Sequence, residues 1–328
     1  MRRVRALCML ERFNTPSAEV VFLTASRPKR TFHGLRGIPG APAFATQLYS
    51  AMRRGRRLEA AVVVFCDVER IGPEIEDKAA ALARTWDQLE SAPLILNRPP
   101  NALRRYPLMK ALKAAGINQH DVARLDDPDG LARIRFPCFV RFENGHLATG
   151  HPNLIEDEKA LRAEIEAMKL RGETLYGKIA LEYVDARDAH GDHVKYSYFR
   201  IGSTLIPSHR FAGPHWFVKS ASPEFLERRP DAIAAERQFI EEAPFQDEIA
   251  RVFDIAGVEY GRVDFGLRSD GGLHVFEINT NPRHPLLSET YQERRDLVRT
   301  VKTRIGDALS NLVSNRRRIR LRWRRGTM

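Results

Sequence analysis

The sequence contains few cysteines and lacks a long apolar run. Its 328 residues include only Cys8, Cys66 and Cys138, which are widely separated and have no paired spacing. This pattern indicates neither a disulfide framework nor a zinc site, so we expect buried free thiols. A stretch of about eighteen apolar residues is missing, which argues against a membrane span. The N-terminal segment 2–10 is too short and too quickly charged for a secretory signal, and we predict a cytoplasmic protein.

Acidic residues are missing from the C-terminal end. The formal net charge is +11, and the segment 315–328 (NRRRIRLRWRRGTM) holds seven arginines, which leaves +4 for the rest of the chain. This tail is typical of attraction to nucleic acid, an anionic membrane surface or an acidic partner, with Trp323 available for stacking. A solvated extension, or a last helix or strand on an acidic patch of the same protein, is the plainer interpretation, because a single arginine-rich end is a weak motif.

The first hundred residues show alternating strand and helix patterns. Short β-branched and apolar runs at 19–24, 60–65 and 93–97 are separated by helix-like segments at 42–57 and 75–90. Such alternation predicts a parallel sheet, and therefore a small N-terminal α/β domain. The chain is longer than a usual single core, and we expect two or three lobes.

Two further strand-like segments lie near the C-terminus, at 261–267 (GRVDFGL) and 273–279 (LHVFEIN). Both alternate polar and apolar residues, so side chains two apart share a face. The link 268–272 (RSDGG) has turn chemistry, which predicts an antiparallel hairpin with the two polar faces side by side.

This hairpin would gather one arginine and three oxygen ligands. Arg262 and Asp264 share a face of the first strand, and Glu277 and Asn279 share a face of the second. Magnesium prefers oxygen donors and usually takes one or two carboxylates together with substrate phosphates. The residues therefore suit magnesium bound to a nucleotide, while a solvated outer face is the plainer interpretation.

The residues after Asn279 favour the magnesium interpretation. The chain continues with TNP, so a strand containing RVDF is followed by VFEINTNP. In order, spacing and residue type this resembles the metal-binding hairpin of the ATP-grasp superfamily, in the style of D-alanine:D-alanine ligase and the ribosomal-protein glutamate ligases. The resemblance implies an ATP-grasp fold in which Asp264, Glu277 and Asn279 hold two Mg²⁺ ions, with Mn²⁺ as an alternative, against ATP. It also implies that Arg262 contacts the acyl-phosphate.

Two weaker matches concern the phosphates. Segment 97–116 resembles the start of the family's ATP-binding region, and the lysine expected there falls on Arg105. Segment 136–141 with the loop 143–150 resembles the strand and glycine-rich loop over the phosphates, and its lysine is Arg141. The planar fork of arginine is no equivalent of a compact ammonium, so these positions depart from the family pattern.

The adenine linker is matched by residues 179–184 (IALEYV). By this resemblance Glu182, Tyr183 and Val184 contact or enclose the base.

The ribose-contacting acid of many ligases falls near Lys195, which is not acidic, and Asp185 or Asp192 could substitute. In segment 208–219 (SHRFAGPHWFVK) we expect Lys219 to face the phosphates.

The resemblance covers about 97–285 and sets the expected organisation. We predict an N-terminal domain at 1–97, an ATP-grasp domain at 98–314 divided into lobes at 98–175 and 176–314, and a tail at 315–328.

The implied activity is ligation of a carboxylate to an amine, or to a thiol, through an acyl-phosphate made from Mg-ATP, with release of ADP and phosphate. Arg105, Arg141 and Lys219 would orient the triphosphate. The substrates would be small-molecule or peptide carboxylates and amines, and the sequence selects neither these nor an oligomeric state. Two alternatives remain: a nucleotide-binding regulator with lost turnover, motivated by the two arginines, and a protein that binds nucleic acid or an anionic surface through its tail.

Overall fold

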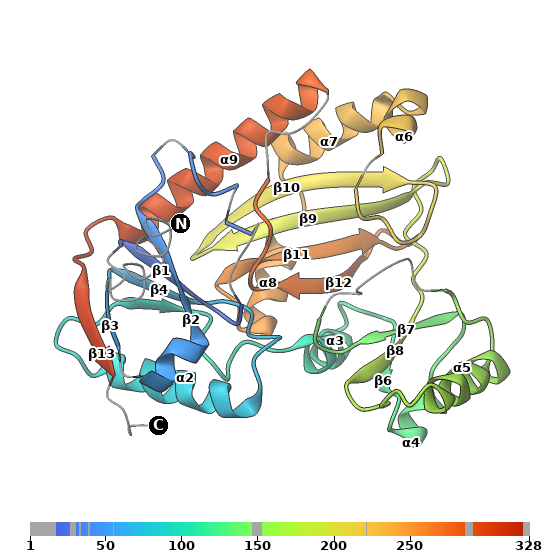
Figure 1. The fold of residues 1–328 in the computed structure, drawn as a ribbon. Coiled ribbons are helices and arrows are strands. Elements are labelled where there is room, and N and C mark those ends of the chain that lie inside the picture. The colour runs from blue at the N-terminus through green and yellow to red at the C-terminus, as the bar shows by residue number, and fades with distance from the viewer. Residues whose placement is uncertain are drawn as a thin grey trace, which may run out of the picture.

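A computed structural model describes residues 18–26, 31–32, 34–38, 40–54, 56–145, 153–220, 222–285 and 291–323 (Figure 1). Three lobes are visible: an N-terminal lobe in blue and cyan, a middle lobe in green, and a C-terminal lobe in yellow to red. Within the described residues no helix is long and apolar enough to cross a membrane. Cys66 and Cys138 are buried free thiols, as predicted, and Cys8 lies outside the described residues.

The N-terminal lobe contains the predicted parallel sheet, with strand order β2-β1-β4-β5. Its central strands consist of fully buried residues, mostly β-branched or aromatic, which suits a sheet covered on both faces. The elements of this lobe are β1 (Val20–Thr24), β2 (Phe44–Leu48), η1 (Tyr49–Arg54), β3 (Arg56–Ala60), β4 (Val62–Phe65), α2 (Pro73–Asp87) and β5 (Leu94–Leu96).

The helix expected over 42–57 is wrong. The segment instead contains β2, the short 3-10 helix η1 and the start of β3. β2 pairs in parallel with the fully buried β1 along its whole length. Pairing to an edge of an existing sheet therefore overrides the local helical pattern.

The arginine-rich tail contributes a strand, β13 (Ile319–Trp323), to the N-terminal lobe. β13 pairs antiparallel with β3, and Leu321 lies opposite Leu58. Both leucine side chains are fully buried. Of the interpretations offered for the tail, a strand on the same protein is therefore confirmed for residues 319–323. The partner strand is not an acidic patch, because its sequence is RRLEA.

The middle lobe is a three-stranded antiparallel sheet with strand order β6-β8-β7. It follows helix α3 (Arg105–Ala114), which leads away from the N-terminal lobe. Because β8 pairs with β6 and β7, this sheet extends past the predicted lobe boundary at 175/176. The elements are β6 (Val122–Arg124), α4 (Pro128–Leu131), β7 (Cys138–Phe142), α5 (Glu158–Leu170) and β8 (Lys178–Glu182).

The C-terminal lobe is a four-stranded antiparallel sheet with strand order β10-β9-β11-β12. Helices α7 and α9 pack against its β9–β10 side (Figure 1). The β11–β12 hairpin is the one predicted from the sequence. The elements are β9 (His193–Ile201), β10 (Thr204–Gly213), α6 (Pro223–Arg228), α7 (Asp231–Glu242), α8 (Gln246–Ala256), β11 (Tyr260–Leu267), β12 (Leu273–Asn279) and α9 (Gln292–Val313).

Candidate functional site

A cavity of about 620 Å³ is lined by residues from all three lobes. Thr31 and Arg70 come from the N-terminal lobe, β7 and the end of β8 from the middle lobe, and β9, β11 and β12 from the C-terminal lobe. Nine of the ten residues predicted to form the site line it: Arg141, Glu182, Tyr183, Val184, Lys219, Arg262, Asp264, Glu277 and Asn279. Arg105, the tenth, reaches the same place through Glu277.

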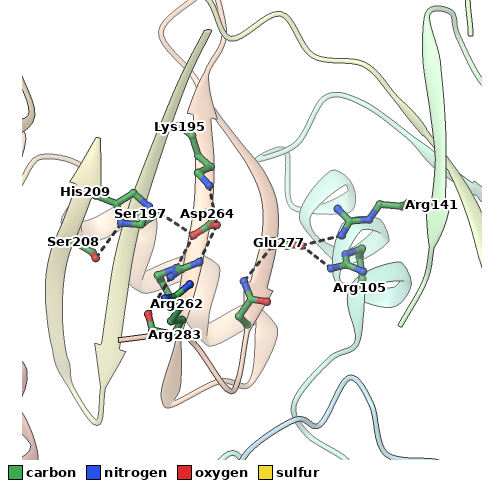
Figure 2. Close-up of polar contacts among 11 residues, drawn as sticks. Arg105, Arg141, Lys195, Ser197, Ser208, His209, Arg262, Asp264, Glu277 and Arg283 are labelled. Atoms are coloured by element: carbon green, nitrogen blue, oxygen red, sulfur yellow. Dashed lines mark hydrogen bonds and ion pairs between the residues drawn. The ribbon is translucent and has the colours of Figure 1, made fainter. Parts of the chain in front are cut away.

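The register of the hairpin brings the predicted metal ligands together. Asp264 lies opposite Glu277, and Arg262 lies opposite Asn279. A β-bulge directly after Asp264 ends this regular pairing. Since directly opposite residues in an antiparallel pair share a face, the four side chains lie on one face of the hairpin. Figure 2 labels three of them, Arg262, Asp264 and Glu277.

Asp264 is 3% exposed and is surrounded by donors. Ser197 Oγ donates to Asp264 Oδ1 (2.7 Å), and the Arg262 guanidinium donates to Oδ1 (2.8 Å) and Oδ2 (3.2 Å). Lys195 Nζ lies 3.6 Å from Oδ2. Burial opposes ionisation, but the positive charges of Arg262 and Lys195 outweigh it and hold the pKa of Asp264 below its usual range.

Glu277 faces two arginines from different elements. Arg105 of α3 and Arg141 of β7 both donate to Oε2, at 2.6 and 3.1 Å. Asn279 Nδ2 donates to Oε1 (3.2 Å), which leaves the amide oxygen of Asn279 directed elsewhere. The two positions where the family carries lysine thus converge on the predicted metal ligand Glu277.

The two arginines differ in their further contacts. Arg105 also donates to the main-chain oxygens of Phe142, Glu143 and Gly145, at 3.2, 2.9 and 3.2 Å. It therefore anchors the described start of the predicted phosphate loop, whose remainder, 146–150, lies outside the described residues. For Arg141, burial and the neighbouring charge of Arg105 lower the pKa to about 10, so this guanidinium is still a cation at neutral pH. Among the described residues, the buried Nε atoms of both arginines have no hydrogen-bond partner.

The other end of the cavity is apolar and aromatic. The ring of Trp216 lies 5.0 Å from that of Phe139 and 5.8 Å from that of Tyr183. Val184 and Phe276 complete this part of the wall. A flat, weakly polar ligand fits between such side chains.

The carboxylate of Glu182 is engaged within the middle lobe. It accepts hydrogen bonds from the main-chain N–H groups of Asp121 and Arg135 and from the Arg135 guanidinium, at 2.8 to 3.1 Å. Burial raises the pKa of Glu182, but Arg135 and the two N–H groups outweigh it and the pKa lies below its usual range. This carboxylate therefore has little capacity left for a ligand.

Neither acid considered for the ribose lines the cavity. Asp185 is bound by Arg187 at 2.8 Å, and Asp192 forms an ion pair with Arg229. Lys219 does line the cavity, with its ammonium 5.2 Å from the centre of the Phe217 ring.

Sequence reasoning missed several polar residues of the site. Lys195 and Ser197 contact Asp264, His209 contacts Ser197, and Arg283 lines the cavity. The alternation of β9 places 195 and 197 on one face, but nothing local shows that this face adjoins Asp264. Only the pairing of β9 with β11 shows that Lys195 and Ser197 adjoin Asp264, and patterns within a single sequence do not predict that pairing.

The donor set fits a magnesium ion that is shared with phosphates. Among the described residues, no three His, Cys, Asp or Glu side chains gather as a complete metal site. Asp264 and Glu277 supply two carboxylates and Asn279 an amide oxygen, which are hard oxygen donors. Two carboxylates with an amide match an ion that completes its coordination with substrate oxygens and water.

Solved ATP-grasp structures have the same architecture. The chain is similar to the ATP-grasp ligase PsnB, solved with precursor peptide PsnA2 and AMPPNP, with a TM-score of 0.52 and 13% identity over 90% of this chain and 99% of that one. It is similar to an ATP-grasp RimK-domain protein from Sphaerobacter thermophilus DSM 20745, with a TM-score of 0.51 and 14% identity over 90% of this chain and 100% of that one. No family model matches the sequence, and no curated protein matches it significantly.

These similarities define the fold of the chain. The similarity extends over 90% of this chain and over nearly the full length of both neighbours. The protein has the ATP-grasp fold, as the hairpin sequence predicted.

Proposed function

We propose that this protein is an ATP-dependent ligase that joins a carboxylate to an amine, or to a thiol, through an acyl-phosphate. The observation that carries the proposal is one cavity with two chemically different ends. Its polar end combines cations with a pair of carboxylates on opposed strands, and its other end is aromatic. A magnesium nucleotide has the same division between triphosphate and base.

The aromatic end would hold adenine. Trp216, Phe139 and Val184 offer flat and apolar surfaces to the ring. Because the Glu182 carboxylate is occupied by Arg135, we assign to residues 182–184 a main-chain and packing role, rather than a side-chain contact from Glu182.

The polar end would hold the triphosphate. We assign Arg105, Arg141 and Lys219 to its oxygens, because guanidinium groups bind phosphate well through paired N–H donors and the ammonium of Lys219 adds a further positive charge. Asp264, Glu277 and the amide oxygen of Asn279 would hold Mg²⁺, which supplies charge neutralisation between the phosphates. Two ions are the expectation from the family, and Mn²⁺ is an alternative.

The chemistry requires positioning more than a general base. An oxygen of the substrate carboxylate attacks the γ-phosphorus, the bond to the β-phosphate oxygen breaks, and ADP leaves. An amine then attacks the acyl carbon, phosphate leaves with the bonding electrons, and the amine loses a proton. Arg262, at the junction of hairpin and cavity, would stabilise the acyl-phosphate and the oxyanion that follows.

The substrates are proposed by chemical class only. PsnB binds a precursor peptide, and the macrocyclase MdnC from Microcystis aeruginosa MRC, similar at a TM-score of 0.50 and 10% identity over 90% of this chain and 99% of that one, binds the precursor peptide MdnA. Peptide carboxylates and amines are therefore the first compounds to test, with small molecules second.

The first experiment is a calorimetric titration of the protein with ATP, with and without Mg²⁺. We expect binding that strengthens with Mg²⁺. Candidate carboxylates are then added with hydroxylamine, which traps an acyl-phosphate as a hydroxamate, and ADP release is followed. Folded protein that binds no ATP in either condition would refute the proposal.

A nucleotide-binding regulator without turnover is the second candidate. It is favoured by the pairing of both arginines with Glu277, which occupies the phosphate cations with a protein carboxylate. The two candidates agree on binding and differ on ADP release. Magnesium-dependent ATP binding without hydroxamate from any carboxylate tested would favour the regulator.

A further inference from the structure

A row of polar side chains crosses the whole C-terminal sheet. His209 of β10 lies opposite Ser197 of β9, Ser197 opposite Asp264 of β11, and Asp264 opposite Glu277 of β12. Paired residues share a face, so the row runs continuously from the far edge strand to the metal ligands (Figure 2). The proposed function uses only the last two members.

The direction of the hydrogen bonds in this row is fixed by chemistry. The Asp264 carboxylate can only accept, so Ser197 gives its single proton to Oδ1 at 2.7 Å. The Ser197 oxygen must then accept from His209, whose Nε2 lies 2.8 Å away. Nε2 of His209 therefore carries a proton, whatever the state of Nδ1, which lies 3.2 Å from Ser208 Oγ.

The position of His209 is set by the backbone and by packing. A β-bulge in β10 shifts the register between Pro207 and His209. Bulges of this kind re-aim a side chain, and they are frequent beside functional sites. The imidazole stacks on the Phe211 ring, with centroids 4.0 Å apart and planes 18° apart.

The row makes the two oxygens of Asp264 unequal. Oδ1 accepts from Ser197 and from Arg262 Nε, at 2.7 and 2.8 Å. Among the described residues, Oδ2 has only the longer contacts, 3.2 Å to Arg262 Nη2 and 3.6 Å to Lys195. Oδ1 is therefore saturated by short bonds, and Oδ2 is the oxygen that a cation can take over.

We propose that His209 is a positioning residue which acts through Ser197 to hold Asp264 so that it offers Oδ2 alone to the divalent cation. The inference rests on the proposed function for the identity of the cation. Hydrogen-bond partners of metal ligands orient those ligands, and losing one typically weakens metal binding about 10- to 100-fold.

In the test, AMPPNP binding is measured by calorimetry at a series of Mg²⁺ concentrations. The quantity compared between variants is the Mg²⁺ concentration at which half of the effect of Mg²⁺ on AMPPNP binding is reached. Ser197→Ala and His209→Phe each break the row, and the second keeps an aromatic ring on Phe211. Both should raise this concentration about tenfold or more. AMPPNP affinity without Mg²⁺ should stay unchanged. His209→Gln, which retains an N–H donor, should recover part of the loss.

The matched control is Ser203→Ala, because Ser203 is exposed in the turn between the same two strands. It should leave the Mg²⁺ requirement unchanged. Equal Mg²⁺ requirements in Ser197→Ala and the wild type would overturn the inference. So would an equal loss of AMPPNP affinity with and without Mg²⁺, because that pattern reports general packing damage.

A second measurement needs no nucleotide, and its result does not depend on a variant that folds poorly. Nitrogen-15 NMR of ligand-free protein reports which imidazole nitrogen carries a proton, with His209→Gln used to assign the signal. We expect a protonated Nε2 in slow exchange with solvent. An Nε2 without a proton would overturn the inference, even if the protein binds ATP. A protonated Nε2 in a protein that does not bind ATP would refute only the proposed function.

Discussion

At the scale of single residues, Glu277 balances more positive charge than it can neutralise. Two guanidiniums donate to one of its oxygens, and burial with the charge of Arg105 lowers the pKa of Arg141. One carboxylate between two buried cations leaves a net positive charge. Phosphate oxygens would relieve it, which is the physical reason for expecting the arginines to change partners when a nucleotide binds.

Glu277→Gln is expected to separate the two roles of this residue. The amide removes the negative charge of the proposed metal ligand but leaves both guanidiniums in place, so AMPPNP affinity should fall at least about tenfold in the presence of Mg²⁺ and should not fall without it. Calorimetry under both conditions measures the difference. Glu248→Gln, at an exposed position of α8, is the control. An unchanged Mg²⁺ dependence in Glu277→Gln would remove Glu277 from the metal site.

Buried neutral histidines should make stability depend on pH. Burial lowers the pKa of His274 and of His284 to about 3. An unfolded histidine has a pKa near 6.5, so between about pH 6.5 and 3 the unfolded chain binds more protons than the folded one. The stabilisation is therefore complete above pH 6.5 and is lost as the pH falls toward 3.

Urea unfolding at pH 7.5 and 5.5 tests this linkage. By the same relation each buried histidine should lower the free energy of unfolding by about 1.4 kcal/mol between these two pH values. His284→Asn should reduce the difference by that amount, whatever its effect at either pH alone. His190→Asn changes an exposed histidine and should leave the difference as in the wild type. If the free energy of unfolding fell as much between pH 7.5 and 5.5 in His284→Asn as in the wild type, the assignment of His284 as a buried neutral histidine would be contradicted.

Residue types and spacing are sufficient to predict how the side chains of the β11–β12 hairpin face one another. Alternation along each strand predicts that Arg262 shares a face with Asp264 and that Glu277 shares a face with Asn279. The strand register confirms that the two pairs lie opposite each other. Lys195 could not be found in this way, because its contact with Asp264 depends on β9 lying beside β11. Sequence patterns describe one strand at a time, whereas this contact crosses between strands 69 positions apart.

At the scale of elements, the local sequence pattern predicts the strands that contain continuous apolar runs. It does not predict β2, a strand at the edge of its sheet. β1 and β4 are fully buried, and their β-branched runs identified them. β2 is only partly buried, with the pattern FATQL, and the helix predicted there is wrong. An edge strand buries less, so its sequence carries less of the alternation or continuity that marks a strand.

The ribbon of β3 and β13 shows why the tail is not simply solvated. Its inner face contains Leu58 and Leu321, both fully buried, and its outer face places Arg57 opposite Arg322. Like charges directly opposite one another in an antiparallel pair are destabilising. On the same face Arg320 lies opposite Glu59, an opposite-charge pair that offsets this repulsion, and the buried leucines supply the packing that stabilises the strand.

Leu321→Ala should lower the free energy of unfolding by about 2 to 5 kcal/mol, because it removes a fully buried side chain opposite another. The neighbouring Arg320→Ala changes an exposed side chain and should stay within about 0.5 kcal/mol of the wild type. Urea unfolding measures both. Equal stability of the two variants would show that β13 does not pack on the lobe in solution.

At the scale of the whole molecule, two asparagines connect the lobes where their sheets meet. Asn118 donates to Val275 O at 3.1 Å and accepts from Val275 N at 2.9 Å, so it extends the edge strand β12. Asn97, which follows β5, donates to Phe65 O and Tyr260 O at 3.0 and 2.7 Å. It links the end of β4 to the start of β11, and so sets how the N-terminal lobe approaches the cavity.

This connection was outside the reach of the sequence. Asn97 stood at the end of a predicted strand, where asparagine is ordinary turn chemistry. Its partners lie 32 and 163 positions away. The ATP-grasp fold was recognisable from a hairpin of about twenty residues, but the arrangement of lobes that completes the cavity depends on such distant, unpatterned polar contacts.

Asn97→Gly should therefore destabilise the protein strongly. Asn97 has a φ of 56°, which glycine adopts without strain, so the substitution isolates the loss of the side-chain hydrogen bonds. These bonds include acceptance from Glu259 N and Tyr260 N at 2.8 and 2.9 Å, and Asn97 is fully buried. Leaving several buried main-chain groups unpaired should cost about 3 kcal/mol or more in the free energy of unfolding.

Asn315→Gly is the matched control for this prediction, because Asn315 has a similar φ of 62° but is exposed. It should change the free energy of unfolding by less than about 0.5 kcal/mol. Urea unfolding of the two variants at one pH gives the comparison directly. If both glycine variants changed stability equally, backbone conformation alone would explain position 97. A large loss confined to Asn97→Gly would identify this side chain as the polar connection between the N-terminal lobe and the sheet that carries Arg262 and Asp264.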